Sequence, residues 1–258
     1  MRTLKLVVEY DGAGYCGWQR QRGSAAGGPP SVQATLERAV AEVAGEPVTV
    51  TGAGRTDAGV HALGQVASLV TTSRIPAARF PAALNAHLPP DVRAVAAEDV
   101  PEGFHARYDA VARTYWYEIL NRPGPPALLR GLAHHIPEPL DVEAMRRAAA
   151  PLVGRHDFVA YRGVGSPTRT TVCRVEALTV GTADGGAPAA GPEARLRIAI
   201  TADRFLRHMV RIIAGTLVRV GLGRLPAEAP EAFLADPDNR RTGPTAPPHG
   251  LYLVRIDY

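Results

Sequence analysis

Alternation of apolar and polar residues predicts four strands in the first half of the chain. Between the first two, apolar residues recur at helical spacing after Ser31, a residue type that caps helix N-termini, and Gly45 ends the pattern. The strands are predicted at 4–10, 48–53, 65–70 and 92–97, and the helices at 31–45 and 76–86. This order, β-α-β-β-α-β, is that of ferredoxin-like units and of many RNA-binding sheets.

The second half repeats this order of patterns. Strands are predicted at 111–120, 171–180, 194–201 and 250–257, helices at 141–154 and 204–220, and a hairpin turn at 183–186. In the first of these strands Arg113, Tyr115 and Tyr117 share one face. We therefore predict an α+β chain of two ferredoxin-like (RRM-like) β-α-β-β-α-β halves, residues 1–106 and 107–258. Their antiparallel or mixed sheets are expected to flank a central basic cleft, since ligand sites favour domain interfaces.

Composition narrows the class of protein. With 46% hydrophobic and 21% charged residues in 258, the chain has ordinary globular values and can bury a sizeable core. A net charge of +4 is compatible with a polyanionic partner. The two cysteines, Cys16 and Cys173, lack metal-ligand spacing, which argues against a zinc site or a disulfide framework. Without a signal-peptide pattern or a bilayer-length apolar run, a cytoplasmic protein that does not contact membranes is expected.

The densest group of chemically distinctive residues is the segment 52–62, which follows a predicted strand and holds three glycines, Arg55, Asp57 and His61. Glycines leave room for a ligand close to the main chain. If the strand continues as far as Arg55, the Arg55 and Asp57 side chains leave the same face, and the guanidinium can orient the carboxylate. The alternative is an Asp that caps a turn beside a solvated Arg.

Two other segments carry weaker signals. The loop 11–21 is rich in glycine, aromatic and amide residues, so it can stack on a base, although Tyr15 and Trp18 can equally cover the edge of the core. In the predicted helix 204–220, basic residues recur at helical spacing and form either a solvated face or a phosphate-binding track. These residues are Arg204, Arg207, His208 and Arg211.

Two common site types fit the glycine-rich segment poorly. His61 lies four residues after Asp57, but the spacing lacks the HExxH arrangement and no second carboxylate cluster accompanies it. A hydrogen-bonding or structural histidine is therefore favoured over a metal ligand. The segment also lacks the Gly-Lys-Ser/Thr of a phosphate-binding P-loop.

Several segments together resemble the TruA family of tRNA pseudouridine synthases. The most specific is GRTDAGVH at 54–61. The others are EYDG at 9–12, GWQRQ at 17–21, FHAR at 104–107, ARTYWY at 112–117, RFLRHMVR at 204–211 and APPHGLYL at 246–253. The resemblance runs in order from Lys5 to Tyr258, and the clearest departure is the Gly/Ala/Pro-rich insertion at 24–30.

The resemblance implies an isomerase that converts uridine to pseudouridine in the anticodon stem-loop of tRNA. It further implies a homodimer that uses no cofactor and no metal. Asp57 would be the nucleophile, Arg55 would orient it, and Tyr115 would stack on the base and assist proton removal from C5. Other residues would bind the RNA: Arg107, Arg113, Arg204, Arg207, His208, Arg211 and Leu251. Whether Asp57 attacks C6 of the base or C1′ of the ribose stays open.

Two alternatives remain at this point. The same topology and charge suit a non-catalytic RNA-binding or RNA-folding module of two RRM-like units, although neither half shows the aromatic RNP pattern. A metal-dependent hydrolase that uses Asp57 and His61 would lose its activity with a chelator.

Overall fold

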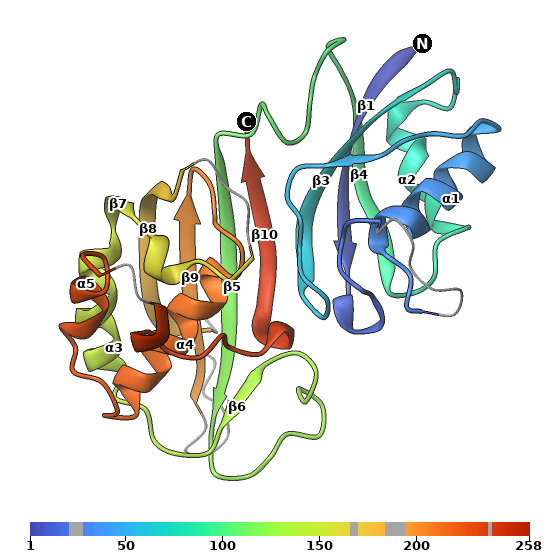
Figure 1. Cartoon of the computed structure of the whole chain (residues 1–258). Helices are drawn as coiled ribbons and strands as arrows, with labels where there is room; N and C mark the ends of the chain where they lie inside the picture. Colours follow the sequence, from blue (N-terminus) through green and yellow to red (C-terminus); the bar gives the residue numbers. More distant parts are fainter. Residues whose placement is uncertain (21–27, 166–169, 184–193, 237–238) are drawn as a thin grey trace. The chain divides into compact units, whose positions relative to one another are not determined.

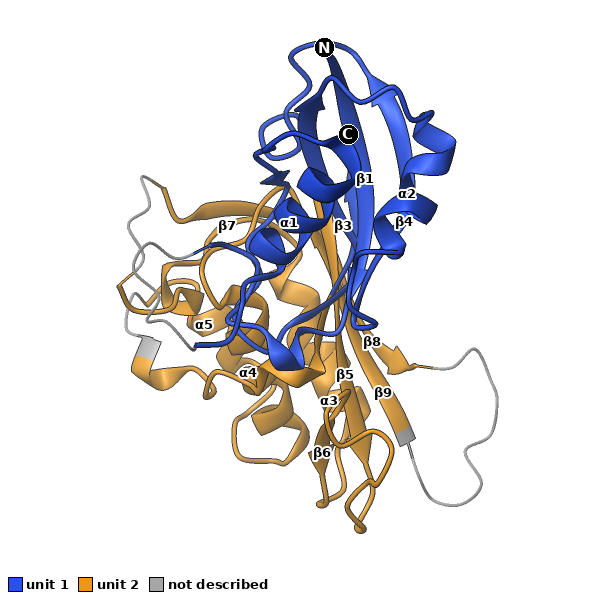
Figure 2. Cartoon of the chain, turned by 90° about the vertical axis from the view of Figure 1, so that its right-hand side faces the viewer, with its two compact units in different colours: residues 1–111, 253–258 blue, residues 112–252 orange. Residues whose placement is uncertain are grey.

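A computed structural model describes residues 1–20, 28–165, 170–183, 194–236 and 239–258. The chain divides into two compact units, coloured separately in Figure 2. Unit 1 comprises Met1–Val111 together with Leu253–Tyr258, and unit 2 comprises Ala112–Tyr252. Both combine sheets with helices, so the predicted α+β class is confirmed. None of the helices in the described ranges has the length and hydropathy needed to cross a bilayer.

Unit 1 is built on an antiparallel sheet whose helices α1 and α2 lie on one face (Figure 1). Its strand order is β4-β1-β3-β10, and β2 also pairs with β3. The elements are β1 (Arg2–Tyr10), a 3₁₀ turn (Gly12–Gly14), α1 (Val32–Ala44), β2 (Thr51–Gly52), β3 (His61–Thr71), a 3₁₀ turn (Ala77–Arg79), α2 (Phe80–Asn85), β4 (Val92–Val100) and β10 (Leu251–Asp257). The last strand thus completes a unit that begins about 250 residues earlier along the chain.

Local sequence accounts for the first strand and helix of unit 1. Leu4 and Leu6 alternate with more exposed neighbours in β1 and are fully buried, as the period of two requires. Ser31 caps α1 by accepting a hydrogen bond from the Ala34 amide at 3.2 Å. Gly45 ends the helix in the left-handed conformation, with φ of 72°. These elements form where the sequence predicted them.

Unit 2 has an antiparallel sheet of order β5-β9-β8-β7, and the short β6 pairs with β5 in parallel. Helices α3 and α4 pack against each other, α3 beside β8 and α4 beside β5 (Figure 1). The main elements are β5 (Ala112–Asn121), β6 (His134–Ile136), α3 (Val142–Ala149), β7 (Gly154–Asp157), β8 (Val172–Thr182), β9 (Ala194–Ala202), α4 (Met209–Gly221) and α5 (Ala229–Ala232). Short 3₁₀ turns span Ala150–Leu152, Val159–Tyr161, Asn239–Arg241 and Pro248–Gly250. Most of the predicted hairpin turn at 183–186 lies outside the described residues.

The predicted start of the strong helix is wrong. Helix α4 begins at Met209, not at 204, and His208 before it has a φ of 60°. A right-handed helix cannot continue through a residue in this left-handed conformation, so α4 cannot extend back past His208. The carbonyl of Arg207 accepts a hydrogen bond from the Gly163 amide at 2.8 Å, so a distant segment holds this stretch out of helical geometry. Residues 204–208 therefore do not share a helical face with Arg211.

The strand predicted at 48–53 is also shorter than expected. β2 contains only Thr51 and Gly52, and β3 begins at His61. Beyond Ala53 the ladder ends, because the Gly54 backbone bonds to the side chain of Gln65 and not to a neighbouring strand. The premise that a continuous strand directs Arg55 and Asp57 to one face is therefore wrong.

Candidate active site

Asp57 lies in the loop that joins β2 to β3 in unit 1. Its side chain is partly exposed, Arg55 is exposed, and Thr56 between them is buried. After Asp57 the chain turns through Gly59, whose φ is 77°, and the Val60 amide donates to the Asp57 carbonyl at 3.2 Å. The backbone of Asp57 is thus held by a tight turn, and the residue as a whole is half-buried.

A second segment, Gly17–Arg20, is hydrogen-bonded to this loop, and we call it the strap. The Trp18 amide donates to the Thr56 carbonyl at 3.1 Å. Gly17 has a φ of 105°, and a Cβ there would lie 2.6 Å from that carbonyl oxygen. A Cβ on Gly52 would lie 2.3 Å from the Trp18 indole nitrogen. Both glycines are required by the close approach of the strap to the Asp57 loop.

Trp18 is therefore part of the core of unit 1. Its side chain is only 1% exposed, and its ring centroid lies 6.1 Å from that of Tyr10. Tyr15 is also buried, and its hydroxyl donates to Asp91 at 2.7 Å. Of the two interpretations of the 11–21 loop, the structure supports a cover for the core and not an exposed stacking platform.

Buried polar side chains fix the loop from the sheet side. The Tyr10 hydroxyl shares a hydrogen bond of 2.8 Å with the hydroxyl of Thr56. Gln65, fully buried in β3, donates from Nε2 to the Gly54 carbonyl at 2.8 Å and accepts from the Gly54 amide at 3.3 Å. Burial raises the pKa of Tyr10 to about 12, against a lowering by hydrogen bonds to Thr56 and Gln65, so this support is neutral at physiological pH. A glutamine inside an apolar strand was the available signal for Gln65, and sequence reasoning missed it.

His61 occupies a structural position. Its ring is 2% exposed, and Nδ1 lies 3.1 Å from the Gly12 amide and 3.0 Å from an Asp11 carboxylate oxygen. An Nδ1 that carries no proton accepts from the Gly12 amide, whereas an Nδ1 that carries one, in the other neutral tautomer or in the charged ring, donates to Asp11. Either way, the contacts of Nδ1 are with the first loop. Across the described ranges there is no group of three or more His, Cys, Asp or Glu side chains placed to hold a metal ion.

In unit 2, Tyr115 and Arg113 lie two residues apart on β5 and contact the segment before α4. Tyr115 is 8% exposed and meets the ring of Phe205 edge to face, with centroids 5.1 Å apart. The Arg113 guanidinium donates to the Asp203 carbonyl at 2.7 Å. The sheet thus brings these two predicted residues together with the segment that carries Arg204.

The predicted RNA-binding arginines of this segment each donate to a backbone carbonyl of unit 2. Arg204 donates to Thr170, Arg207 to Val164 at 3.2 Å, and Arg211 to Ala246 at 2.7 Å. A guanidinium has five N–H donors, so one side chain can fix a loop and still present positive charge. The arginines therefore also tie together the loops around the start of α4.

The remaining predicted residues have different settings. His208 is half-buried at the N-cap of α4, and Leu251 is buried at the start of β10. Arg107 is exposed in unit 1, with its guanidinium carbon 5.9 Å from the Tyr108 ring centroid. Unit 1 thus holds the candidates Arg55, Asp57 and Arg107, whereas unit 2 holds Arg113, Tyr115, Arg204, Arg207, His208, Arg211 and Leu251.

A carboxylate on a backbone fixed by glycines and buried side chains suits an enzyme with an acidic catalytic group, because such a site needs a rigid support. Comparison with known proteins identifies the family to which this chain belongs. The family model described as tRNA pseudouridine synthase matches residues 6–109 and 148–258. The chain belongs to this family, and the predicted class, an isomerase acting on uridine in tRNA, is confirmed.

Curated relatives match over the whole length of both chains. A protein named tRNA pseudouridine synthase A from Thermoanaerobacter sp. (strain X514) is 44% identical over 258 residues. Proteins of the same name from Acetivibrio thermocellus and Moorella thermoacetica are 43% and 45% identical over 258 residues. The resemblance noted from the motifs therefore extends through the complete chain.

Proposed function

We propose that this protein isomerises uridine to pseudouridine in the anticodon stem-loop of tRNA, with Asp57 as the nucleophile. The observation that carries the proposal is the setting of Asp57. Its backbone is held between the strap Gly17–Arg20 and the turn at Gly59, and the residue is half-buried in a glycine-rich loop. Membership in the family supports the reaction.

The reaction is a rearrangement within one nucleotide. The Asp57 carboxylate adds to the substrate and forms a covalent adduct, which divides one difficult step into two easier ones. The N1–C1′ glycosidic bond breaks, the base turns, and C5 bonds to C1′. C5 then loses its proton, N1 ends with a proton, and the carboxylate leaves, so that neither electrons nor atoms are gained or lost. No step needs a redox partner.

The other candidate residues complete the proposal. Tyr115 stacks on the base and assists removal of the C5 proton, and Arg55 orients Asp57. Arg107, Arg113, Arg204, Arg207, His208 and Arg211 bind the RNA backbone, and Leu251 packs against the base. A uridine in a stem must first be flipped out of it, at a cost of a few kcal/mol, and arginines that bind the displaced backbone offset part of that cost.

We also propose the finer architecture expected from the sequence. The element order β-α-β-β-α-β of unit 1, with both helices on one face of an antiparallel sheet, supports a ferredoxin-like half. The net charge of +4 is in keeping with a basic cleft between two halves divided near residue 106. A cytoplasmic homodimer that binds one tRNA through both subunits is the proposed assembly, and membership in the family supports it.

Tritium release from tRNA labelled at C5 of uridine tests the proposal. The wild-type protein should release tritium in the presence of EDTA, and Asp57→Asn should release none while it still binds tRNA. Asp99→Asn is the matched control, since Asp99 lies on β4 of the same unit, paired with Arg2 at 3.2 Å, and should stay active.

Each other outcome has a clear meaning. Full activity of Asp57→Asn would remove Asp57 as the nucleophile. Binding of tRNA without tritium release by the wild-type protein would favour the non-catalytic RNA-binding module. Loss of activity in EDTA would indicate a metal-dependent reaction.

A further inference from the structure

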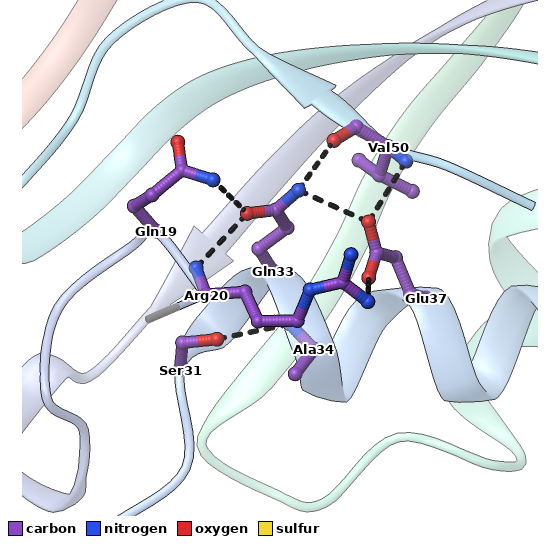
Figure 3. A network of polar contacts seen from close by, with 7 residues as sticks. All are labelled: Gln19, Arg20, Ser31, Gln33, Ala34, Glu37 and Val50. Carbon is purple, nitrogen blue, oxygen red and sulfur yellow. Dashed lines mark hydrogen bonds and ion pairs between the residues drawn. The ribbon is translucent and has the colours of Figure 1, made fainter. Parts of the chain in front are cut away.

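Gln33 is a buried glutamine whose side-chain amide makes four hydrogen bonds (Figure 3). It lies in the first turn of α1 and is 6% exposed. Its Oε1 accepts from Gln19 Nε2 at 2.6 Å and from the Arg20 amide at 3.0 Å. Its Nε2 donates to Glu37 Oε1 at 3.0 Å and to the Val50 carbonyl at 2.9 Å. Both lone pairs and both protons of the amide are in use.

These bonds connect the two segments that lead to the Asp57 loop, the strap Gly17–Arg20 and the residue before β2. On one side, Gln33 holds the strap Gly17–Arg20, and its own backbone amide donates to the Trp18 carbonyl at 3.0 Å. On the other side, it holds Val50, the residue directly before β2. Glu37 reinforces this side, because it accepts from the Val50 amide at 3.1 Å (Figure 3).

From each end a short path leads to Asp57. The strap reaches Thr56 through the hydrogen bond from the Trp18 amide. Val50 leads through β2 to the same loop, and Gly52 in β2 packs directly on the Trp18 ring. A displacement of the Gln33 amide would therefore move both supports of the Asp57 backbone.

The choice of glutamine at this position calls for an explanation beyond packing of the helix. Leu36 and Val40 on the same helix are fully buried apolar residues, and an apolar residue at 33 would extend that packing. Each hydrogen bond of a buried amide adds only a modest net stability, and an amide left without a partner is costly. Its bonds do, however, have fixed directions, and such bonds set geometry.

We propose that Gln33 is a positioning residue for Asp57, acting through the strap Gly17–Arg20 and through Val50. The inference rests on the proposed function, since it concerns the geometry of the proposed nucleophile. Misplacement of a reacting group by about 1 Å can lower a rate on the order of 100-fold. Loss of the Gln33 amide should therefore lower the rate of the chemical step more than it lowers tRNA binding.

The test is Gln33→Met, which keeps the length and helix propensity of the side chain and removes its hydrogen bonds. We expect the single-turnover rate at saturating protein to fall roughly 10-fold to 100-fold, with the Kd for tRNA within about twofold of wild type. Val40→Ala is the control, because it removes buried volume from the same helix away from the strap. It should lower the melting temperature and leave the single-turnover rate unchanged.

A second variant keeps the test decisive if Gln33→Met does not fold. Gln33→Glu is isosteric, but it places a carboxylate oxygen against Glu37 Oε1 and the Val50 carbonyl, so it should also slow the chemical step.

The outcomes separate this inference from the proposed function. If Asp57→Asn is inactive and Gln33→Met or Gln33→Glu reacts at the wild-type rate, the positioning role is wrong and the nucleophile stands. A loss of rate that only parallels the loss of melting temperature, as in Val40→Ala, would also overturn it. If Asp57→Asn is active, the proposed function itself fails.

Discussion

Gly52 shows how much a single residue contributes to the site. Its hydrogen faces the Trp18 indole, so Gly52→Ala would place a methyl group 2.3 Å from the ring nitrogen and 2.4 Å from the adjacent ring carbon. Either β2 or the ring must move. We expect a loss of about 1–3 kcal/mol in the free energy of unfolding, together with a large loss of tritium release.

Gly124→Ala is the control for this prediction, because a Cβ on Gly124 would meet no described atom within 4 Å and the φ of this glycine is not positive. Urea unfolding of both variants gives the comparison. Equal stability of Gly52→Ala and Gly124→Ala would show that the strap is loosely packed on β2.

Single residues were predictable to different degrees. The dense glycine-rich segment with its one carboxylate identified Asp57 as the candidate. The environment of Trp18 was not predictable, since a tryptophan beside glycines fits both a base-stacking loop and a buried core. Gln33 was missed because helical periodicity records which face is buried and does not show that a buried amide connects two distant segments.

At the scale of elements, His134 in β6 should make the stability of the fold depend on pH. Burial, followed by the nearby His249 and His135, lowers the pKa of His134 to about 4, and its Nδ1 is buried with no hydrogen-bond partner among the described residues. The unfolded chain has an ordinary histidine pKa near 6.5, so it binds a proton that the folded chain rejects. The contribution of neutral, buried His134 to the free energy of unfolding is therefore fully present above about pH 6.5 and is lost as the pH falls toward about 4.

His134→Phe should make the melting temperature less sensitive to pH between 7.5 and 5, because the group that takes up the proton is removed. The ring can still meet Tyr117, whose centroid lies 6.0 Å from that of His134. Thermal unfolding at both pH values measures the effect. Identical slopes for wild type and variant would assign the acid sensitivity to other groups.

Elements were predicted best where local signals agree. Strand β1 and helix α1 follow from alternation, a serine cap and a terminal glycine. The start of α4 was not predictable, because the Arg207 carbonyl is held by Gly163, a contact across 44 residues of sequence. The end of β2 depends on the Gln65 side chain in the same way. In both places a hydrogen bond to a residue outside the local segment overrode local propensity.

For the whole molecule, a further prediction follows because unit 1 is made of two separate stretches of the chain, Met1–Val111 and Leu253–Tyr258. Deletion of residues 253–258 removes most of β10, whose neighbour in unit 1 is β3, and takes away the fully buried Leu253 and the hydrogen bond from Tyr258 to the Ala106 carbonyl. Loss of a buried leucine side chain alone costs about 2–5 kcal/mol. We expect the deletion to lower the melting temperature sharply and to speed hydrogen exchange in β3.

Arg255→Ala is the matched control, because this exposed side chain lies on the same strand and pairs with nearby Asp257 at 2.9 Å. Surface changes of this kind usually alter stability by no more than about 0.5 kcal/mol. A truncated chain that melts at the wild-type temperature would show that unit 1 is stable without β10.

The same discontinuity has a consequence for protein synthesis. On the ribosome, residues 1–111 emerge long before residues 253–258, so the sheet of unit 1 lacks most of β10 while all of unit 2 is being translated. Unit 2 is contiguous, so all of its residues have been translated before unit 1 is complete. The unit that carries Asp57 is therefore completed last although most of it is translated first, and a nascent chain stalled before residue 253 lacks the final segment of that unit.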